Sequence, residues 1–461
     1  MRIARFFLTL SVGLLSAYPG PYPPGGSCNI NGGPPDSICI GAPFGDNAVL
    51  QRAPARAAIT GSVPRGYGTA PMTVTTAFVD EESDWQISVS TTVRDDNTWK
   101  VLLPPRPTGG NYSFQASCTA GCVGTNRSAA ARLVNLTMGD VYICSGQSNM
   151  QLMMEYTFER NTSVAAIRKG NYDNIRIFHG PMNFDYATNR TDIWVIAGQQ
   201  GGDRTDLTVG AWRYPRDTVD LIPNGWNTPP FYLTTNFGRM YATCWYTFEA
   251  LTDALIAAGK QPPPFGLIAV AVGGTKIAQW VEWTAQAGCT NVTCCDTQDC
   301  TQSPTSNPDP YQPISHVNCT GNAQLYNGLI APLVNCTVAG WLFYQGENSL
   351  CYDAGSSQQS KGYGCMMPTL ISSWRKVWSV EPGTTDPLAP FGFVSLADGT
   401  DEGYGINMRQ FRWAQTANYG RVPNAAMPRC FIAEGMYTSQ PPQIISPSSL
   451  ALLHRRKCTL R

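Results

Sequence analysis

The stretch VYICSGQSNMQLMM, residues 141–154, joins an apolar run to an abrupt polar break. Its first four residues suit a buried strand, and Gly146, Gln147, Ser148 and Asn149 follow almost at once. Glycine and small polar residues at such a point favour a tight turn that leads into a helix. A serine between a strand and a helix is well placed to attack a substrate, so Ser148 is the first candidate catalytic residue.

The same kind of apolar run recurs along the second part of the chain and predicts buried strands. These runs cover residues 136–146, 174–180, 265–274, 338–347 and 391–399. Longer helical patterns, such as residues 244–259 and 366–379, separate them. Continuous apolar strands that alternate with helices are typical of a parallel sheet with helices on both faces. This pattern therefore predicts that residues 131–436 form an α/β domain.

The first part of the chain has a different pattern. Residues 41–130 contain short runs in which apolar and polar residues alternate, separated by Gly, Pro and Asp turns. This spacing predicts a small β-sandwich ahead of the α/β domain. A chain of 461 residues is also long enough for two or three domains.

The charge balance excludes some partners. Lys and Arg together number 32, as do Asp and Glu, and charged residues make up 14% of the chain. An average soluble domain has about 25%. Without a basic patch the sequence gives no basis for binding nucleic acid or an anionic membrane, so we expect a small or neutral partner.

The start of the chain predicts secretion or delivery to the endolysosomal system. Arg2 and Arg5 precede an apolar stretch that ends near Ala17, which is typical of a signal peptide over residues 1–17. No other apolar run is long enough to span a bilayer, so we expect no membrane anchor. We also expect N-glycans, because the chain has eight Asn-x-Ser/Thr sequons, at Asn111, Asn126, Asn135, Asn161, Asn189, Asn291, Asn318 and Asn335.

Sixteen cysteines fit the same oxidising compartment. The dense run at residues 289–300 lacks paired CxxC spacing and a neighbouring histidine, so disulfides in a surface insertion are favoured over a zinc site. Cys118 and Cys122 are close enough in sequence to form a local bridge.

Polar residues follow three of the predicted strands, where parallel α/β sheets bind their ligands. Besides GQSNM at residues 146–150, these are GGTKIAQW at residues 273–280 and YQGENS at residues 344–349. Each alone is an ordinary turn or helix cap. Together they offer a serine hydroxyl, glycine N–H groups and a side-chain amide, which are the groups that acyl transfer needs in a nucleophile and an oxyanion hole.

Four motifs, in this order along the chain, resemble the sialate O-acetylesterases of the SGNH-hydrolase superfamily. They are GDVYICSGQSNMQ (139–151), FGLIAVAVGGTKIAQW (265–280), LYNGLIAPLVNCTVAGWLFYQGENS (325–349) and FRWAQTANYGRVPNAAMP (411–428). The resemblance spans residues 41–436 and implies a flavodoxin-like α/β/α fold. It also implies hydrolysis of O-acetyl esters on sugars or glycoconjugates, above all O-acetylated sialic acids, with no metal or organic cofactor.

The resemblance also implies roles for particular residues. Ser148 would be the nucleophile, and its N–H would share the oxyanion with Gly273 or Gly274 and with the amide of Gln345 or Asn348. The remaining polar or aromatic residues of the same segments are candidates for substrate binding, namely Gln147, Asn149, Thr275, Trp280 and Glu347.

The catalytic base is where the sequence departs from the family. The family carries Asp and His together in a D-x-x-H-P pattern after the last strand, whereas this chain has no Asp or Glu after Glu434 and has Ser446 where the histidine is expected. Residues 437–461 are therefore an atypical C-terminal tail.

The chain has three histidines, and only His454 follows the last predicted strand, which makes it the candidate base. We favour a structural role for His179 and a solvated loop position for His316. Two hypotheses remain open: an active carbohydrate O-acetylesterase, or an impaired or C-terminally truncated relative that binds acetylated glycans.

Overall fold

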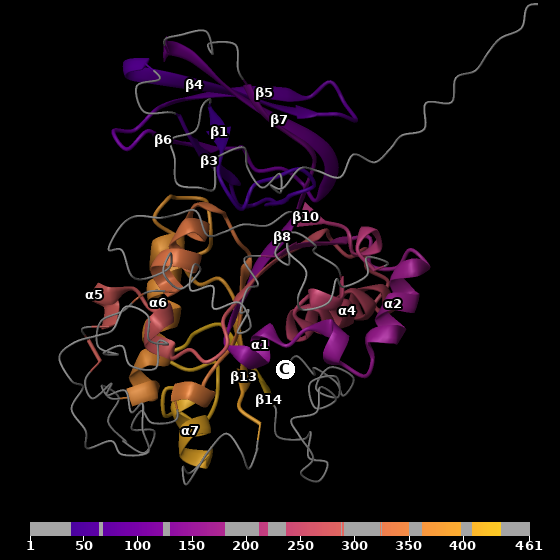
Figure 1. Ribbon diagram of the computed structural model, residues 1–461, viewed down its shortest axis with the longest axis vertical. Coiled ribbons are helices and arrows are strands. Elements are labelled where there is room, and N and C mark those ends of the chain that lie inside the picture. The colour runs from indigo at the N-terminus through magenta and orange to yellow at the C-terminus, as the bar shows by residue number, and fades with distance from the viewer. Residues whose placement is uncertain are drawn as a thin grey trace, which may run out of the picture.

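The computed structural model describes residues 38–63, 68–122, 130–179, 212–219, 237–286, 288–289, 323, 325–349, 362–397 and 408–434. These residues form a β-layer and, below it, a sheet with helices on both sides (Figure 1). The expected signal peptide and the tail at 437–461 lie outside the described residues, as do Asn126, Asn189, Asn291 and Asn318.

The β-layer consists of two groups of strands that face each other. One is an antiparallel sheet of β1 (Cys39–Ile40), β3 (Ala58–Ser62) and β6 (Thr98–Leu102). The other contains β4 (Gly68–Asp80), β5 (Gln86–Thr92), β7 (Gly109–Cys122) and the first part of β8 (Ala130–Gly146). Trp99 and Phe114 pack between them with ring centroids 6.5 Å apart.

The main sheet has the order β10-β9-β11-β8-β12-β13-β14. All neighbouring pairs from β9 to β14 are parallel, and β10 is an antiparallel edge strand. The further strands are β2 (Val49–Gln51), β9 (Ile175–His179), β10 (Trp212–Arg213), β11 (Phe265–Ala271), β12 (Gly340–Tyr344), β13 (Phe391–Ser395) and β14 (Cys430–Glu434). Every residue of β11, β12 and β13 is buried, which explains their continuous apolar sequences.

Helices cover both faces of this sheet, with α5, α6 and α7 on one side and α2 and α4 on the other (Figure 1). The α-helices are α1 (Ser148–Gln151), α2 (Arg160–Arg168), α4 (Ala242–Ala257), α5 (Trp283–Gln286), α6 (Gly362–Trp378) and α7 (Met408–Gln415). Short helical turns include η6 (Ile277–Trp280), η8 (Tyr326–Ile330), η9 (Ala331–Asn335) and η10 (Glu347–Ser349). The α/β architecture expected for residues 131–436 is therefore present.

Five parallel strands have the flavodoxin-like order that the family resemblance implies. Numbered along the chain, β8, β11, β12, β13 and β14 are strands 1 to 5, and they lie in the order 2-1-3-4-5. Strand β9 is an addition to this order, because it pairs with β11 on the side away from β8. After β8 the chain forms β9 and β11 on one side of it and then β12 on the other, so β8 is a topological switch point of the sheet. Its carboxyl end is therefore a position where ligands bind in such sheets.

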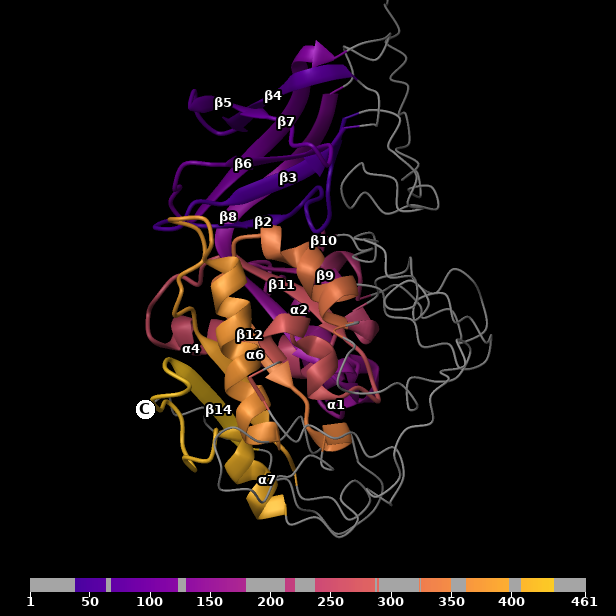
Figure 2. The same ribbon diagram turned by 90° about the vertical axis from the view of Figure 1, so that its left-hand side faces the viewer.

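Strand β8 belongs to both parts of the molecule. Its first half pairs with β7, and from Asp140 onward it pairs with β11, so it runs from the β-layer to the far end of the main sheet (Figures 1 and 2). The boundary expected after residue 130 therefore falls at the start of a continuous strand. Arg52 strengthens this junction, because its guanidinium donates to both Asp140 oxygens at 2.8 Å.

Three disulfides lie among the described residues. Cys118 pairs with Cys122 as the sequence predicts, and Cys289 at the start of the cysteine-dense segment pairs with Cys365 of α6. The third joins Cys144 of β8 to Cys244 of α4 across a separation of 100 residues. Because it closes so long a loop, we expect it to stabilise the fold by several kcal/mol, about 2–5 in typical cases.

A buried carboxylate on α4 makes stability depend on pH. Glu249 accepts hydrogen bonds from Ser163 at 2.7 Å and from the Trp245 indole at 2.5 Å. Burial raises the pKa of Glu249 above its ordinary value of 4.5, although the bonds from Ser163 and Trp245 oppose the shift. The stability that this group contributes is therefore fully present below pH 4.5 and is lost as the pH rises through the raised pKa.

Replacing this carboxylate should flatten the pH dependence. Glu249→Gln should gain stability relative to the native protein as the pH rises from 4.5 to 7, by about 1.4 kcal/mol for each unit of pKa shift. Urea unfolding at the two pH values measures this. The exposed Glu82 is the matched control, and the free energy of unfolding of Glu82→Gln should change with pH as that of the native protein does. The same pH dependence in Glu249→Gln would contradict the expectation.

Candidate active site

The three polar strand ends of the sequence meet at one edge of the sheet. Gly146, the last residue of β8, pairs with Ala271 of β11 on one side and with Tyr344 of β12 on the other. The residues that follow each strand therefore leave the sheet side by side, at the end remote from the β-layer, where Figure 1 shows α1. This is the convergence that the motifs predict.

Gly146 has no room for a side chain. Its φ angle is +143°, and a Cβ atom there would lie 2.0 Å from the Tyr344 carbonyl oxygen. The strand can thus turn sharply against β12 only because this residue is glycine. The turn brings the next residue, Gln147, below the surface and Ser148 above it.

Gln147 ties the turn after β8 to the turn after β12. Only 1% of Gln147 is exposed, and its Oε1 accepts hydrogen bonds from Gln345 Nε2 at 2.9 Å and from the N–H groups of Gly346 and Asn348 at 3.3 and 3.4 Å. Its own N–H donates to the Tyr344 carbonyl. Gln147, a candidate substrate contact from the sequence, is therefore buried beneath the site.

Gln345 extends this network to the turn after β11. Its Nε2 lies 3.0 Å from the Thr275 carbonyl oxygen and 2.9 Å from the Ser349 hydroxyl, and it is buried. Tyr363 of α6 donates to Gln345 Oε1 at 3.0 Å, which fixes the orientation of the amide. These bonds occupy the Gln345 amide, so it is not directed toward a substrate.

The exposed residues of these turns are Ser148, Gly274 and Asn348, one from each strand end. A Cβ atom placed on Gly273 would lie 3.4 Å from Ser148 Cβ, and one placed on Gly274 would lie 3.6 Å from Asn348 Nδ2. The glycine turn therefore lies beside both the serine and the Asn348 side-chain amide.

The two alternatives that the sequence leaves open for the oxyanion donors differ in their hydrogen bonds. The Gly273 N–H donates to Gln151 Oε1 at 2.9 Å, whereas no hydrogen bond among the described residues uses the Gly274 N–H. Gly274 and Asn348 are thus the available donors, and Gly273 and Gln345 are held by other partners. The sequence motifs do not predict a role for Gln151 at the site, although it lies one helical turn after Ser148. Nothing in the sequence indicates that Tyr363 contacts Gln345.

The other candidate substrate contacts divide into two pairs. Asn149 donates from Nδ2 to Glu347 Oε1, which links the turn after β8 to η10 beside the serine. Thr275 and Trp280 are both fully buried, and the Trp280 indole donates to the Thr275 hydroxyl at 3.0 Å. This pair packs under the glycine turn, so its polar groups do not face a substrate.

The base cannot be placed from the described residues. His316 and His454 lie outside them, and of His179 the backbone alone is described, at the end of β9 and paired with Ala269. In the described part of the chain, no three His, Cys, Asp or Glu residues form a group that could hold a metal ion. No helix there has the length and apolar character needed to cross a membrane.

Comparisons with known proteins identify relatives. No protein-family model matches the chain. The sialate O-acetylesterase of Mus musculus is 30% identical over 412 residues, which cover 84% of this chain and 65% of that protein. The human sialate O-acetylesterase is 28% identical over 398 residues, which cover 85% of this chain and 63% of that protein. The chain thus spans slightly less than two thirds of these relatives.

Among solved structures, the chain resembles a carbohydrate acetylesterase from Xanthomonas citri. The TM-score is 0.57 and the identity 20%, with 89% of this chain and 71% of that one covered. This likeness supports the α/β fold described above.

The fold and the site together define an α/β protein with an exposed serine at the end of its central strand. The particular relationship follows from the sequence matches: the chain is a homologue of the sialate O-acetylesterases, as its motifs predict.

The tight turn at Gly146 generates a prediction. Gly146→Ala should destabilise the protein by more than about 3 kcal/mol, because the added methyl group meets a backbone carbonyl in the core. Gly170 is a matched control, since its φ angle is also positive but a Cβ there meets nothing within 4 Å. Gly170→Ala should cost only about 1 kcal/mol. Urea unfolding compares the two, and equal losses would contradict the argument.

Proposed function

We propose that this protein is a serine esterase that removes O-acetyl groups from carbohydrates, with O-acetylated sialic acids as the first substrates to test. The observation that carries the proposal is the exposed group of Ser148, Gly274 and Asn348 above a buried hydrogen-bond network. The activity named for the homologues supports the same substrate class.

The proposed reaction has two steps. Ser148 Oγ attacks the acetyl carbonyl carbon while a base takes its proton, and the sugar oxygen leaves with a proton, so that acetyl-Ser148 remains. Water then attacks this ester by the same route, and acetate leaves. In both steps the carbonyl oxygen becomes negative, and the N–H groups of Ser148 and Gly274 with the Asn348 amide would stabilise it.

The identity of the base distinguishes the two forms of the proposal. A histidine that reaches Ser148 makes the chain a full esterase, and His454 is the candidate. If no histidine reaches it, the same pocket would bind acetylated glycans and turn them over slowly. We further propose that the protein passes through the secretory pathway and carries N-glycans, which its leader and sequons support.

The first prediction tests the nucleophile. Ser148→Ala should lower hydrolysis of an aryl acetate at least about a thousandfold, because no other group can form the acyl intermediate. Ser372, an exposed serine of α6, is the control, and Ser372→Ala should keep the native rate. Spectrophotometric release of the phenol measures both variants. Retention of activity in Ser148→Ala would reject the site.

The second prediction concerns the base. Aryl acetates have good leaving groups and need little acid assistance, whereas a sugar alkoxide must be protonated as it leaves. We therefore expect weak aryl acetate hydrolysis and much weaker release of acetate from O-acetyl sialic acid. If His454 reaches Ser148, His454→Ala should lower both rates, whereas His316→Ala should not. An unchanged rate would remove His454 as the base, and full activity on the sugar ester would show that another group transfers the proton.

A further inference from the structure

A cavity of about 390 Å³ lies at the junction between the β-layer and α6. Its walls come from the inner sheet of the β-layer, from η8 and η9, and from the end of α6, which Figure 2 shows rising to meet that layer. Pockets that hold small ligands span about 300–1,000 Å³ and are common at domain junctions. This one is separate from the candidate active site, which lies at the other end of the sheet (Figure 1).

The lining is half apolar and half polar. Ala58, Val334 and Val377 supply apolar surface, whereas the charged lining residues are Arg94, Lys100 and Glu381. Burial lowers the pKa of Lys100, and the Glu381 carboxylate opposes that shift, so the two side chains lie close enough to interact. Such a lining offers apolar surface together with hydrogen-bond donors and acceptors, which can contact the hydroxyl and acetamide groups of an N-acetylated sugar.

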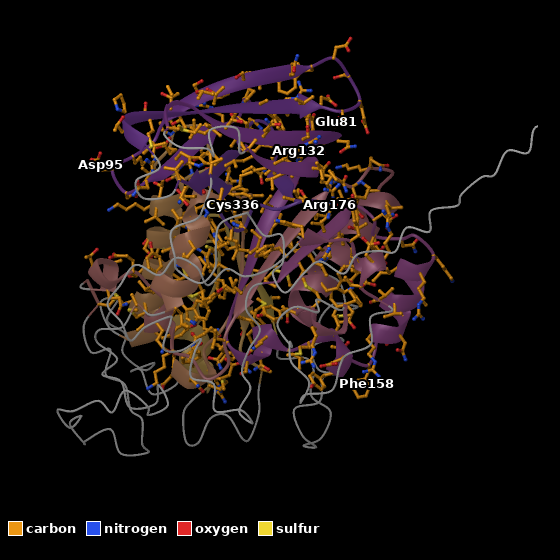
Figure 3. All side chains as sticks on the ribbon, turned by 45° about the horizontal axis from the view of Figure 1, so that its top comes forward. Glu81, Asp95, Arg132, Phe158, Arg176 and Cys336 are labelled. Atoms are coloured by element: carbon orange, nitrogen blue, oxygen red, sulfur yellow. A yellow bond between two sulfur atoms is a disulfide. The ribbon has the colours of Figure 1, made fainter. Side chains whose placement is uncertain are left out.

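Asn335 lines the same cavity and begins the sequon Asn335-Cys336-Thr337. No hydrogen bond among the described residues uses its side-chain amide, so the amide nitrogen can carry a substituent. The rest of the sequon is buried: Thr337 accepts a hydrogen bond from the Ala58 N–H and donates to the Arg56 carbonyl. Figure 3 labels Cys336 where the β-layer meets the helices below.

Three other sequons lie in the described residues, at Asn111, Asn135 and Asn161, and the last two provide contrasts. Asn135 uses its amide nitrogen fully, because Nδ2 donates to Asn47 Oδ1 at 2.6 Å and to the Tyr214 hydroxyl at 3.2 Å. A sugar there would replace one hydrogen and break one of these bonds. Asn161, at the start of α2, is exposed, so a glycan on it would extend into solvent.

We propose that the cavity holds the first sugar residues of an N-glycan on Asn335, and that this glycan packs between the β-layer and α6 as part of the folded structure. In the transfer, the amide nitrogen loses one hydrogen and bonds to the anomeric carbon of N-acetylglucosamine, while the lipid pyrophosphate of the oligosaccharide donor leaves. Transfer precedes folding, because the folded chain buries Thr337. The inference rests on passage through the secretory pathway and is independent of the esterase activity.

The test uses protein secreted from a eukaryotic host and peptide N-glycosidase F in ¹⁸O-labelled water, which converts each glycosylated Asn to labelled Asp. After denaturation, peptides with Asn161 and Asn335 should both carry the label. With native protein, Asn161 should react first and Asn335 at least roughly tenfold more slowly, because release there requires local opening. Asn335→Gln should also lower the melting temperature, whereas Asn161→Gln should not.

An unmodified Asn335 in the denatured sample would overturn the proposal. Release from native protein at the same rate as from Asn161 would overturn the packed position. Both outcomes are measured on the unsubstituted protein, so the result does not depend on whether Asn335→Gln folds.

Discussion

One side-chain oxygen, Oε1 of Gln147, holds the site together. It accepts N–H groups from Gln345, Gly346 and Asn348, and so joins the turn after the central strand to the turn after β12. Gln345 then reaches the turn after β11 through the Thr275 carbonyl. Each of these donors would cost about 1–3 kcal/mol if it were left buried without a partner. The network therefore resists any change in the spacing of the three exposed groups above it.

This network explains why residues close together in the sequence differ in burial. Gln147 and Gln345 are buried and hold the turns, whereas Ser148 and Asn348 project from the same turns to solvent. The same contrast separates Gly273, whose N–H donates to Gln151, from Gly274. A preorganised set of donors of this kind is what stabilises an oxyanion without reorganisation during the reaction.

Local patterns in the sequence predict much of this arrangement. The buried strands, the helices at residues 244–259 and 366–379, and the meeting of the three strand ends all follow from apolar periodicity and from polar residues at strand ends. The position of β11 between β8 and β9 does not, because a buried parallel strand is apolar on both faces whichever neighbour it has. The choice of Gly274 and Asn348 also depends on turn geometry, which the motifs alone do not determine. The Cys144–Cys244 disulfide joins residues 100 positions apart, and sequence spacing gives no basis for such a pairing.

The proposed mechanism requires that Ser148 is the residue that receives the acyl group. An organophosphonate that reacts with activated serines, followed by peptide mass spectrometry, tests this most directly because it reports which atom is modified. The account predicts one adduct, on the peptide that contains Ser148, and its loss when an O-acetyl sugar or an acetate ester competes. An adduct on a different serine, with Ser148 unmodified, would contradict it.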